Sequence, residues 1–128
     1  MAEGRGSAMA ITLLLCLFFI HCEMAQAKYY FVGGSKGWTF NVTNWTKGKT
    51  FRAGDVLVFN YPAMAHNVVA LKNRVAYNWC LKTRDAKVYQ TGKDRIRLVE
   101  GYNYFICSYP GHCRAGMKIA IKARKKLL

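Results

Sequence analysis

The sequence predicts an all-β fold, a sandwich of about seven to eight antiparallel strands with one short helix. Short segments rich in Val, Ile, Tyr and Phe recur at spacings of about 8–12 residues, as in β-sandwiches. Glycines separate these segments as turns. No segment resembles a βαβ unit and no glycine-rich phosphate loop is present, which excludes the common nucleotide-binding folds. A length of 128 residues suits a single domain.

Residues 1–27 are predicted to be a secretory signal peptide and not part of the fold. A short polar start containing Arg5 precedes the apolar stretch Ala8–Ile20, and Ala25-Gln26-Ala27 has the small-x-small pattern that signal peptidase recognises. The apolar stretch is shorter than the roughly 20 residues that a membrane-spanning helix needs. An uncleaved anchor is the alternative. We expect residues 28–128 to form the mature domain, which begins at Lys28.

The predicted strands follow one another along this mature domain. In order they are Tyr29–Val32, Val56–Tyr61, Val68–Leu71, Ala86–Tyr89, Ile96–Val99, Tyr102–Cys107 and Met117–Ile121. Their β-branched and aromatic residues suit a pleated, half-buried surface. The blurred alternation of Tyr102–Cys107 indicates a strand buried on both faces, whereas Lys118–Lys122 alternates cleanly with its lysines facing water. The one stretch suited to a helix is Asn73–Trp79.

The mature domain is basic and poor in acids. The whole chain has 20 Lys and Arg residues against 6 Asp and Glu, a net charge of +14. Removing the signal peptide takes away one basic and two acidic residues, so 19 and 4 remain and the net charge becomes +15. With so few carboxylates, and no Ser/His/Asp set, carboxylate or serine catalysis is not expected. The sequence therefore does not predict an enzyme.

One predicted loop gathers the residue types of a metal site. Cys107, His112 and Met117 follow at five-residue steps between two strands, and His66 precedes the strand Val68–Leu71. One thiolate, two imidazoles and a distant thioether are the ligands of a blue copper electron-transfer site. Soft sulfur favours Cu(I), imidazole suits both oxidation states, and a weak axial Met lets the ion change state with little rearrangement. The alternatives are purely structural roles for these residues, or zinc, which seldom takes a thioether.

Cysteine counting is consistent with this interpretation. The mature domain keeps Cys80, Cys107 and Cys113, an odd number that leaves one thiol special or paired with another chain. Three pairings are possible. If Cys107 is the copper thiolate, Cys80 pairs with Cys113 and staples the ligand loop to the preceding segment. A Cys107–Cys113 disulfide is the competing pairing, and it would destroy the metal site.

Longer runs of the chain resemble a known family. They are Val32–Phe40 (VGGSKGWTF), Phe51–Tyr61 (FRAGDVLVFNY), His66–Val69 (HNVV) and Tyr104–Ala120, which contains the ligand loop. Through these runs the chain resembles the phytocyanins, and more closely their plantacyanin (plant basic blue protein) branch. The resemblance implies a cupredoxin-like Greek-key β-sandwich and one type 1 copper ion. It assigns the metal to His66, Cys107, His112 and Met117, and a disulfide to Cys80 and Cys113.

The resemblance also implies finer roles. Stellacyanin-like members have Gln at the axial position, so Met117 favours the plantacyanin branch. Asn67 occupies a position whose side chain ties the two ligand loops together near the cysteine sulfur, and such contacts orient ligands and tune the metal. The alternative is an ordinary turn asparagine. His112 would lie near the surface and serve as the electron port.

Two functions of different classes follow. The first is single-electron transfer by Cu(II)/Cu(I) cycling, with an unidentified small-molecule or protein redox partner. The second is extracellular matrix binding or signalling, in which the basic surface attracts acidic cell-wall polysaccharide. Secretion argues against nucleic acid, the generic partner of basic surfaces. We expect a monomer secreted to the apoplast or cell wall.

Two smaller expectations complete this picture. The chain ends eleven residues after Met117 in a basic segment without an apolar tail, so we expect no lipid or membrane anchor. Asn41 and Asn44 begin two adjacent glycosylation sequons. We expect at most one of them to be used.

Overall fold

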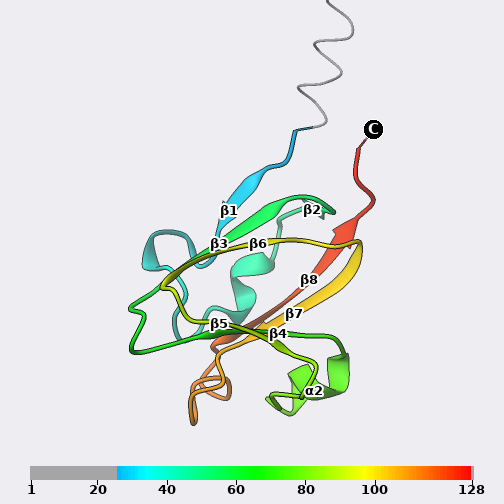
Figure 1. Cartoon of the computed structure of the whole chain (residues 1–128). Coiled ribbons are helices and arrows are strands. Elements are labelled where there is room, and N and C mark those ends of the chain that lie inside the picture. The colour runs from blue at the N-terminus through cyan, green and yellow to red at the C-terminus, as the bar shows by residue number, and fades with distance from the viewer. Residues whose placement is uncertain (1–25, 128) are drawn as a thin grey trace, which may run out of the picture.

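The computed structural model describes residues 26–127 (Figure 1). The predicted signal peptide lies almost entirely outside these residues and stays a prediction. The strands are β1 (Tyr29–Phe31), β2 (Phe51–Arg52), β3 (Val56–Asn60), β4 (Val68–Leu71), β5 (Lys87–Tyr89), β6 (Lys93–Arg97), β7 (Gly101–Ile106) and β8 (Lys118–Arg124). The helices are α2 (Arg74–Asn78) and the 3-10 turns η1 (Gly34–Lys36) and η2 (Thr43–Thr46). Within this part of the chain, no helix has the length and apolar character to cross a membrane.

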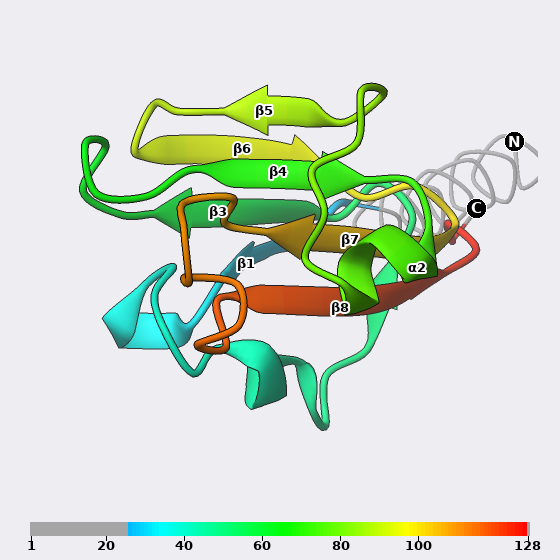
Figure 2. The ribbon, with the colours of Figure 1, turned by 90° about the horizontal axis from the view of Figure 1, so that it is seen from below.

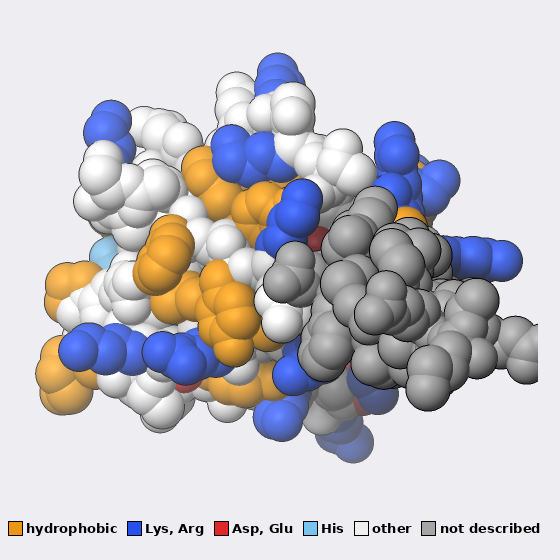
Figure 3. Space-filling model, turned by 90° about the horizontal axis from the view of Figure 1, so that it is seen from above, with side chains coloured by type: hydrophobic (Ala, Val, Ile, Leu, Met, Phe, Trp, Pro, Cys, Tyr) orange, Lys and Arg blue, Asp and Glu red, His pale blue; other side chains and the backbone are white. Residues whose placement is uncertain are grey.

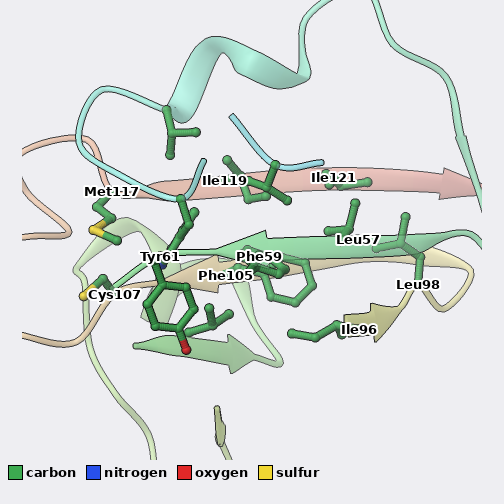
Figure 4. Packing of buried hydrophobic residues seen from close by; sticks show 14 of the residues in the cluster. Leu57, Phe59, Tyr61, Ile96, Leu98, Phe105, Cys107, Met117, Ile119 and Ile121 are labelled. Atoms are coloured by element: carbon green, nitrogen blue, oxygen red, sulfur yellow. The ribbon is translucent and has the colours of Figure 1, made fainter. Parts of the chain in front are cut away.

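The strands form two sheets around a shared core. One sheet has the order β1-β3-β6, and the other has the order β2-β8-β7-β4-β5. Figure 4 shows side chains from both sheets meeting between them, among them Leu57, Phe59, Phe105 and Ile119, which are almost fully buried. The predicted all-β sandwich with one short helix is confirmed.

The expectation of antiparallel pairing is wrong for two pairs of strands. β1 pairs in parallel with β3, and β2 pairs in parallel with β8. Parallel strands need a long connection. The segment from residue 32 to residue 55 supplies one between β1 and β3, and it carries η1, η2 and β2. The remaining strand pairs are antiparallel.

Three strands differ from the predicted set by more than one residue. β8 continues to Arg124, beyond the predicted end at Ile121. β2 has two residues, too few for a periodic signal, and was not predicted. β6 was predicted at Ile96–Val99 but begins earlier, at Lys93. Its inward positions include Asp94, a buried carboxylate that accepts hydrogen bonds from Thr91 and from the hydroxyl of Tyr61. Because an acidic residue occupies an inward position, the first part of β6 lacks the alternation of apolar and polar residues that predicts a strand.

The helix α2 forms a second, smaller core on the outer face of the five-stranded sheet (Figure 2). Asn73 caps it by accepting a hydrogen bond of 2.8 Å from the backbone N–H of Ala76, a favoured N-cap interaction. Tyr77 of α2 packs with Tyr104 of β7 at 5.3 Å between ring centroids. Cys113 of the ligand loop also belongs to this cluster. The helix therefore supports the loop from outside the sandwich.

Candidate metal centre

The sheet topology brings the predicted ligands to one end of the sandwich. Cys107 directly follows β7 and Met117 directly precedes β8, and the register pairs Ile106 with Lys118. Cys107 and Met117 therefore lie opposite each other, and the Cys107 N–H donates to the Met117 carbonyl at 3.0 Å. β4 pairs antiparallel with β7, so His66, two residues before β4, reaches the same end.

Three donor atoms converge there. The Nδ1 atoms of His66 and His112 are 3.1 Å apart, and the Sγ of Cys107 lies 3.5 Å from the Nδ1 of His112. The potential donor atoms of these three residues all lie within 4.8 Å of one another. Imidazole nitrogens held about 2.0–2.1 Å from one metal ion are separated by about 3–4 Å. The observed spacing therefore fits a single small ion.

The site is shielded from water, which favours a defined coordination. Cys107 is completely buried and His66 is 8% exposed, while His112 is partly exposed. Burial lowers the pKa of His66, and the proximity of His112 lowers it further, which favours the neutral imidazole that binds metals.

Met117 completes the predicted set. Its side chain is fully buried. Figure 4 shows the sulfur atoms of Met117 and Cys107 at the same end of the core, from the facing ends of β8 and β7. Two imidazoles, one thiolate and a thioether fit copper better than zinc, because structural zinc sites take more thiolates and seldom a thioether.

Asn67 ties the two ligand-bearing segments together, as the resemblance implies. Its side-chain amide donates to the Ser108 hydroxyl at 2.8 Å, and its side-chain carbonyl accepts from the Ser108 N–H at 2.8 Å. Its own backbone carbonyl accepts from the indole of Trp38 at 2.8 Å. This buried residue therefore joins the segment of His66 to the segment of Cys107.

The disulfide between Cys80 and Cys113 is present, with Cα atoms 5.8 Å apart. Cys107 is the one free cysteine among residues 26–127. Because Cys113 adjoins His112, the disulfide anchors the loop next to a predicted ligand. It also leaves the Cys107 thiol available.

A feature that sequence reasoning missed is the aromatic cover over the histidines. The ring of Phe40 stands edge-on to His66 at 5.5 Å and to His112 at 4.9 Å between centroids. The ring of Tyr109 also lies near His112, at 5.7 Å between centroids. Phe40 was part of a family motif, but nothing local in the sequence pointed to contact with both histidines.

The segment with the two sequons braces the end of the ligand loop. The N–H groups of Asn41 and Val42 donate to the carbonyls of Ala115 and Gly116 at 3.2 and 3.0 Å, and the Thr43 hydroxyl also donates to the Gly116 carbonyl. Gly116 has a φ of +88°, and a Cβ atom there would lie 3.0 Å from the Asn41 backbone. Asn41 and Asn44 are both exposed, and their glycosylation stays a prediction.

A two-sheet β-sandwich that carries His, Cys, His and Met donors at one end defines a cupredoxin. Comparison with known proteins agrees. The family described as "Plastocyanin-like domain" matches residues 38–117. The chain belongs to the phytocyanins, a family of blue copper proteins, and its relatives include basic blue proteins and plantacyanin.

Individual relatives are similar over nearly their whole length. A chemocyanin of Lilium longiflorum is 47% identical over 126 residues, covering 96% of this chain and 99% of its own. The basic blue protein of Cucumis sativus is 55% identical over 94 residues, covering 73% and 97%. The structure described as cucumber basic protein, a blue copper protein, superposes with a TM-score of 0.72 at 55% identity, covering 74% and 98%. The matching family is one of electron-transfer cupredoxins, and no catalytic family is indicated.

Proposed function

We propose that this protein is a secreted type 1 copper protein that transfers single electrons, with the ion held by His66, Cys107, His112 and Met117. The observation that carries the proposal is the convergence of two imidazole Nδ1 atoms and one buried thiol sulfur within 4.8 Å. The family is one of electron-transfer cupredoxins, which supports the same role. When bound, copper supplies the reversible one-electron Cu(II)/Cu(I) couple.

The chain's own residues have separate tasks in this proposal. Cys107 supplies a thiolate inside the core, where water is excluded. His66 supplies a neutral imidazole, and Met117 supplies a weak sulfur donor from the facing strand. His112 is partly exposed and binds through Nδ1, which leaves its other ring edge for an external one-electron donor or acceptor. His112 is therefore the proposed electron port.

The test is the visible and electron paramagnetic resonance spectrum of the mature domain loaded with Cu(II). We expect an intense blue thiolate-to-copper band with narrow hyperfine splitting, and we expect Cys107→Ser to abolish both. A colourless protein that keeps a titratable thiol would show that the thiol does not bind copper and would refute the proposal.

The chain provides a matched control for the fourth ligand. Met64 is 93% exposed and lies two residues before His66, whereas Met117 is fully buried. Met117→Leu should alter the blue band and shift the reduction potential. Met64→Leu should leave both unchanged. Equal effects of the two substitutions would remove Met117 from the ligand set.

A second candidate function, binding of acidic cell-wall polysaccharide, is favoured by the basic outer face of the five-stranded sheet. Tyr102 is half-exposed, and Arg74 and Lys122 lie 5.1 and 5.7 Å from its ring centroid. Lys122 also lines a hollow of about 370 Å³ together with Lys49 and Arg124. Figure 3 shows Lys and Arg side chains spread over another face, with few acidic side chains among them. Such surfaces attract polyanions.

This second function is tested by retention on immobilised polygalacturonate over a salt gradient. Lys122→Glu should elute at lower salt than Lys36→Glu, a control with the same charge change on η1. Retention that is unchanged in Cys107→Ser would separate wall binding from copper. Equal elution of the two lysine variants would refute a role for this particular face.

A further inference from the structure

A buried carboxylate lies at the end of the sandwich remote from the metal centre. Asp55 is 6% exposed and directly precedes β3. Its Oδ2 accepts a hydrogen bond of 2.9 Å from the backbone N–H of Arg52 in β2. Its Oδ1 accepts one of 3.0 Å from the backbone N–H of Lys28, just before β1. Since β1 and β2 belong to different sheets, this one carboxylate links the two sheets.

The nitrogen of Lys28 is the atom that signal-peptide cleavage would change. In the unprocessed chain it is a neutral peptide N–H. Hydrolysis of the Ala27–Lys28 peptide bond consumes one water molecule, leaves a carboxylate on Ala27 and turns this nitrogen into a primary amine. In neutral solution that amine is largely protonated. A new positive charge therefore arises 3.0 Å from Asp55 without any movement of the chain.

We propose that cleavage after Ala27 completes the fold by forming an ion pair between the new α-ammonium of Lys28 and the carboxylate of Asp55. This inference rests on the secretory processing contained in the proposed function but not on copper binding. Asp55 is then the hydrogen-bond acceptor for the mature N-terminus. Cleavage of the Ala27–Lys28 bond removes the leader and also adds an ion pair to the folded domain.

The position of the cut is what the structure specifies. The Lys28 carbonyl accepts a hydrogen bond of 2.8 Å from the Val56 N–H, which fixes Lys28 against the start of β3. A cut one residue later would remove both backbone contacts of Lys28. A cut one residue earlier would leave a neutral amide beside Asp55 and carry the charge outward. Only cleavage before Lys28 places the ammonium against the carboxylate.

Neighbouring cations oppose the pair but do not outweigh it. Arg52, Arg97 and Lys126 line the same surface hollow as Asp55. These three residues are partly or fully exposed, and their charged groups lie at the ends of long side chains. Water and salt therefore screen these charges. The Lys28 nitrogen is held by the backbone at hydrogen-bonding distance, and charge-assisted hydrogen bonds are stronger than neutral ones.

The experiment compares defined chains 28–128 and 27–128, each prepared with and without the substitution Asp55→Asn. The one-residue extension keeps the Lys28–Asp55 hydrogen bond but makes the nitrogen an amide again. We expect chain 28–128 to melt on the order of 4–8 °C higher than chain 27–128. Asp55→Asn should abolish this difference, because it removes the negative charge that attracts the ammonium. Its effect on the contact with the Arg52 N–H is common to both chains and cancels in the comparison. Asp85→Asn, at an exposed acid, should preserve it.

A difference that survives Asp55→Asn, or the absence of any difference, would overturn the ion pair. If the Asp55→Asn variant does not fold, the rate of acylation of the terminal amine is measured instead. Acylating reagents attack only the uncharged amine, so an ion pair that stabilises the ammonium slows the reaction. The amine of chain 28–128 should react more slowly than that of chain 27–128, as measured by peptide mass spectrometry, and equal rates would overturn the pair. Mass spectrometry of the secreted protein should place the N-terminus at Lys28. Another terminus would overturn the proposal for the natural protein, because only cleavage before Lys28 places the ammonium beside Asp55. Melting temperature, acylation rate and the position of the N-terminus do not depend on bound copper. A negative result in these measurements is therefore distinct from a failure of the copper site.

Discussion

Truncating Asn67 tests whether the chain, and not the metal, holds the ligand segments together. Asn67→Ala removes two hydrogen bonds to Ser108 and leaves the Ser108 N–H without its partner. Each lost hydrogen bond costs about 0.5–1.5 kcal/mol, and leaving the part-buried Ser108 N–H unpaired costs at most the about 1–3 kcal/mol of a fully buried donor. We expect a total loss of about 2–4 kcal/mol of unfolding free energy. Loosening of the site should also weaken copper binding by about 10–100-fold, as is common when residues that orient ligands are changed.

Urea unfolding of the metal-free domain measures the first effect, and competition with a copper chelator measures the second. Ser108→Ala is the matched control. It removes the hydroxyl but keeps the hydrogen bond from the backbone N–H of residue 108 to the side-chain carbonyl of Asn67. It should cost about 1 kcal/mol. The double variant should be little worse than Asn67→Ala alone. If Asn67→Ala is no more destabilising than Ser108→Ala, the tie does not hold the two segments and the reasoning fails.

Three further predictions follow from the same region. Replacing both Cys80 and Cys113 with Ser should cost roughly 3–4 kcal/mol in urea unfolding, because the disulfide closes a loop with a sequence separation of 33. The blue band should survive this change, and its loss would mean that the disulfide positions a ligand. Gly116→Ala should destabilise more than Gly111→Ala. Both glycines have positive φ, but a Cβ at Gly116 would lie only 3.0 Å from the Asn41 backbone, whereas a Cβ at Gly111 would meet open space. Equal unfolding free energies of the two variants would refute the close approach. Chelating the copper should leave the far-ultraviolet circular dichroism unchanged, and loss of the β signal would show that the metal organises the fold.

The sequence predicted the central strands closely because their signals are local. β3, β4 and β7 lie within one residue of the predicted bounds, since each is rich in apolar or aromatic residues. The parallel pairings of β1 and β2 depend on how a long connection crosses between sheets, which no local pattern encodes. β6 was shifted because Asp94, a charged residue, occupies an inward position.

In the candidate site, too, features with a local signal could be predicted from the sequence, and contacts between distant segments could not. Residue chemistry and spacing were enough to select Cys107, His112 and Met117, because they share one loop. The role of Asn67 came only from the resemblance, since a single asparagine beside a histidine has no pattern of its own. The cover by Phe40 and the close approach of Asn41 to Gly116 join segments that lie far apart along the chain. Such contacts arise from packing and leave no periodic trace in the sequence.

The arrangement of supports explains why this end of the sandwich suits electron transfer. Cys107 is fixed by its backbone bond to Met117, and the segment of His66 is tied to that of Cys107 through Asn67. His112 is held by backbone hydrogen bonds to Tyr109 and Met117. None of these contacts involves a metal ion. The donor atoms are therefore placed by the chain, so a change in the charge of a bound ion finds ligands that are already held. Small ligand movement between oxidation states is the property that a one-electron carrier requires.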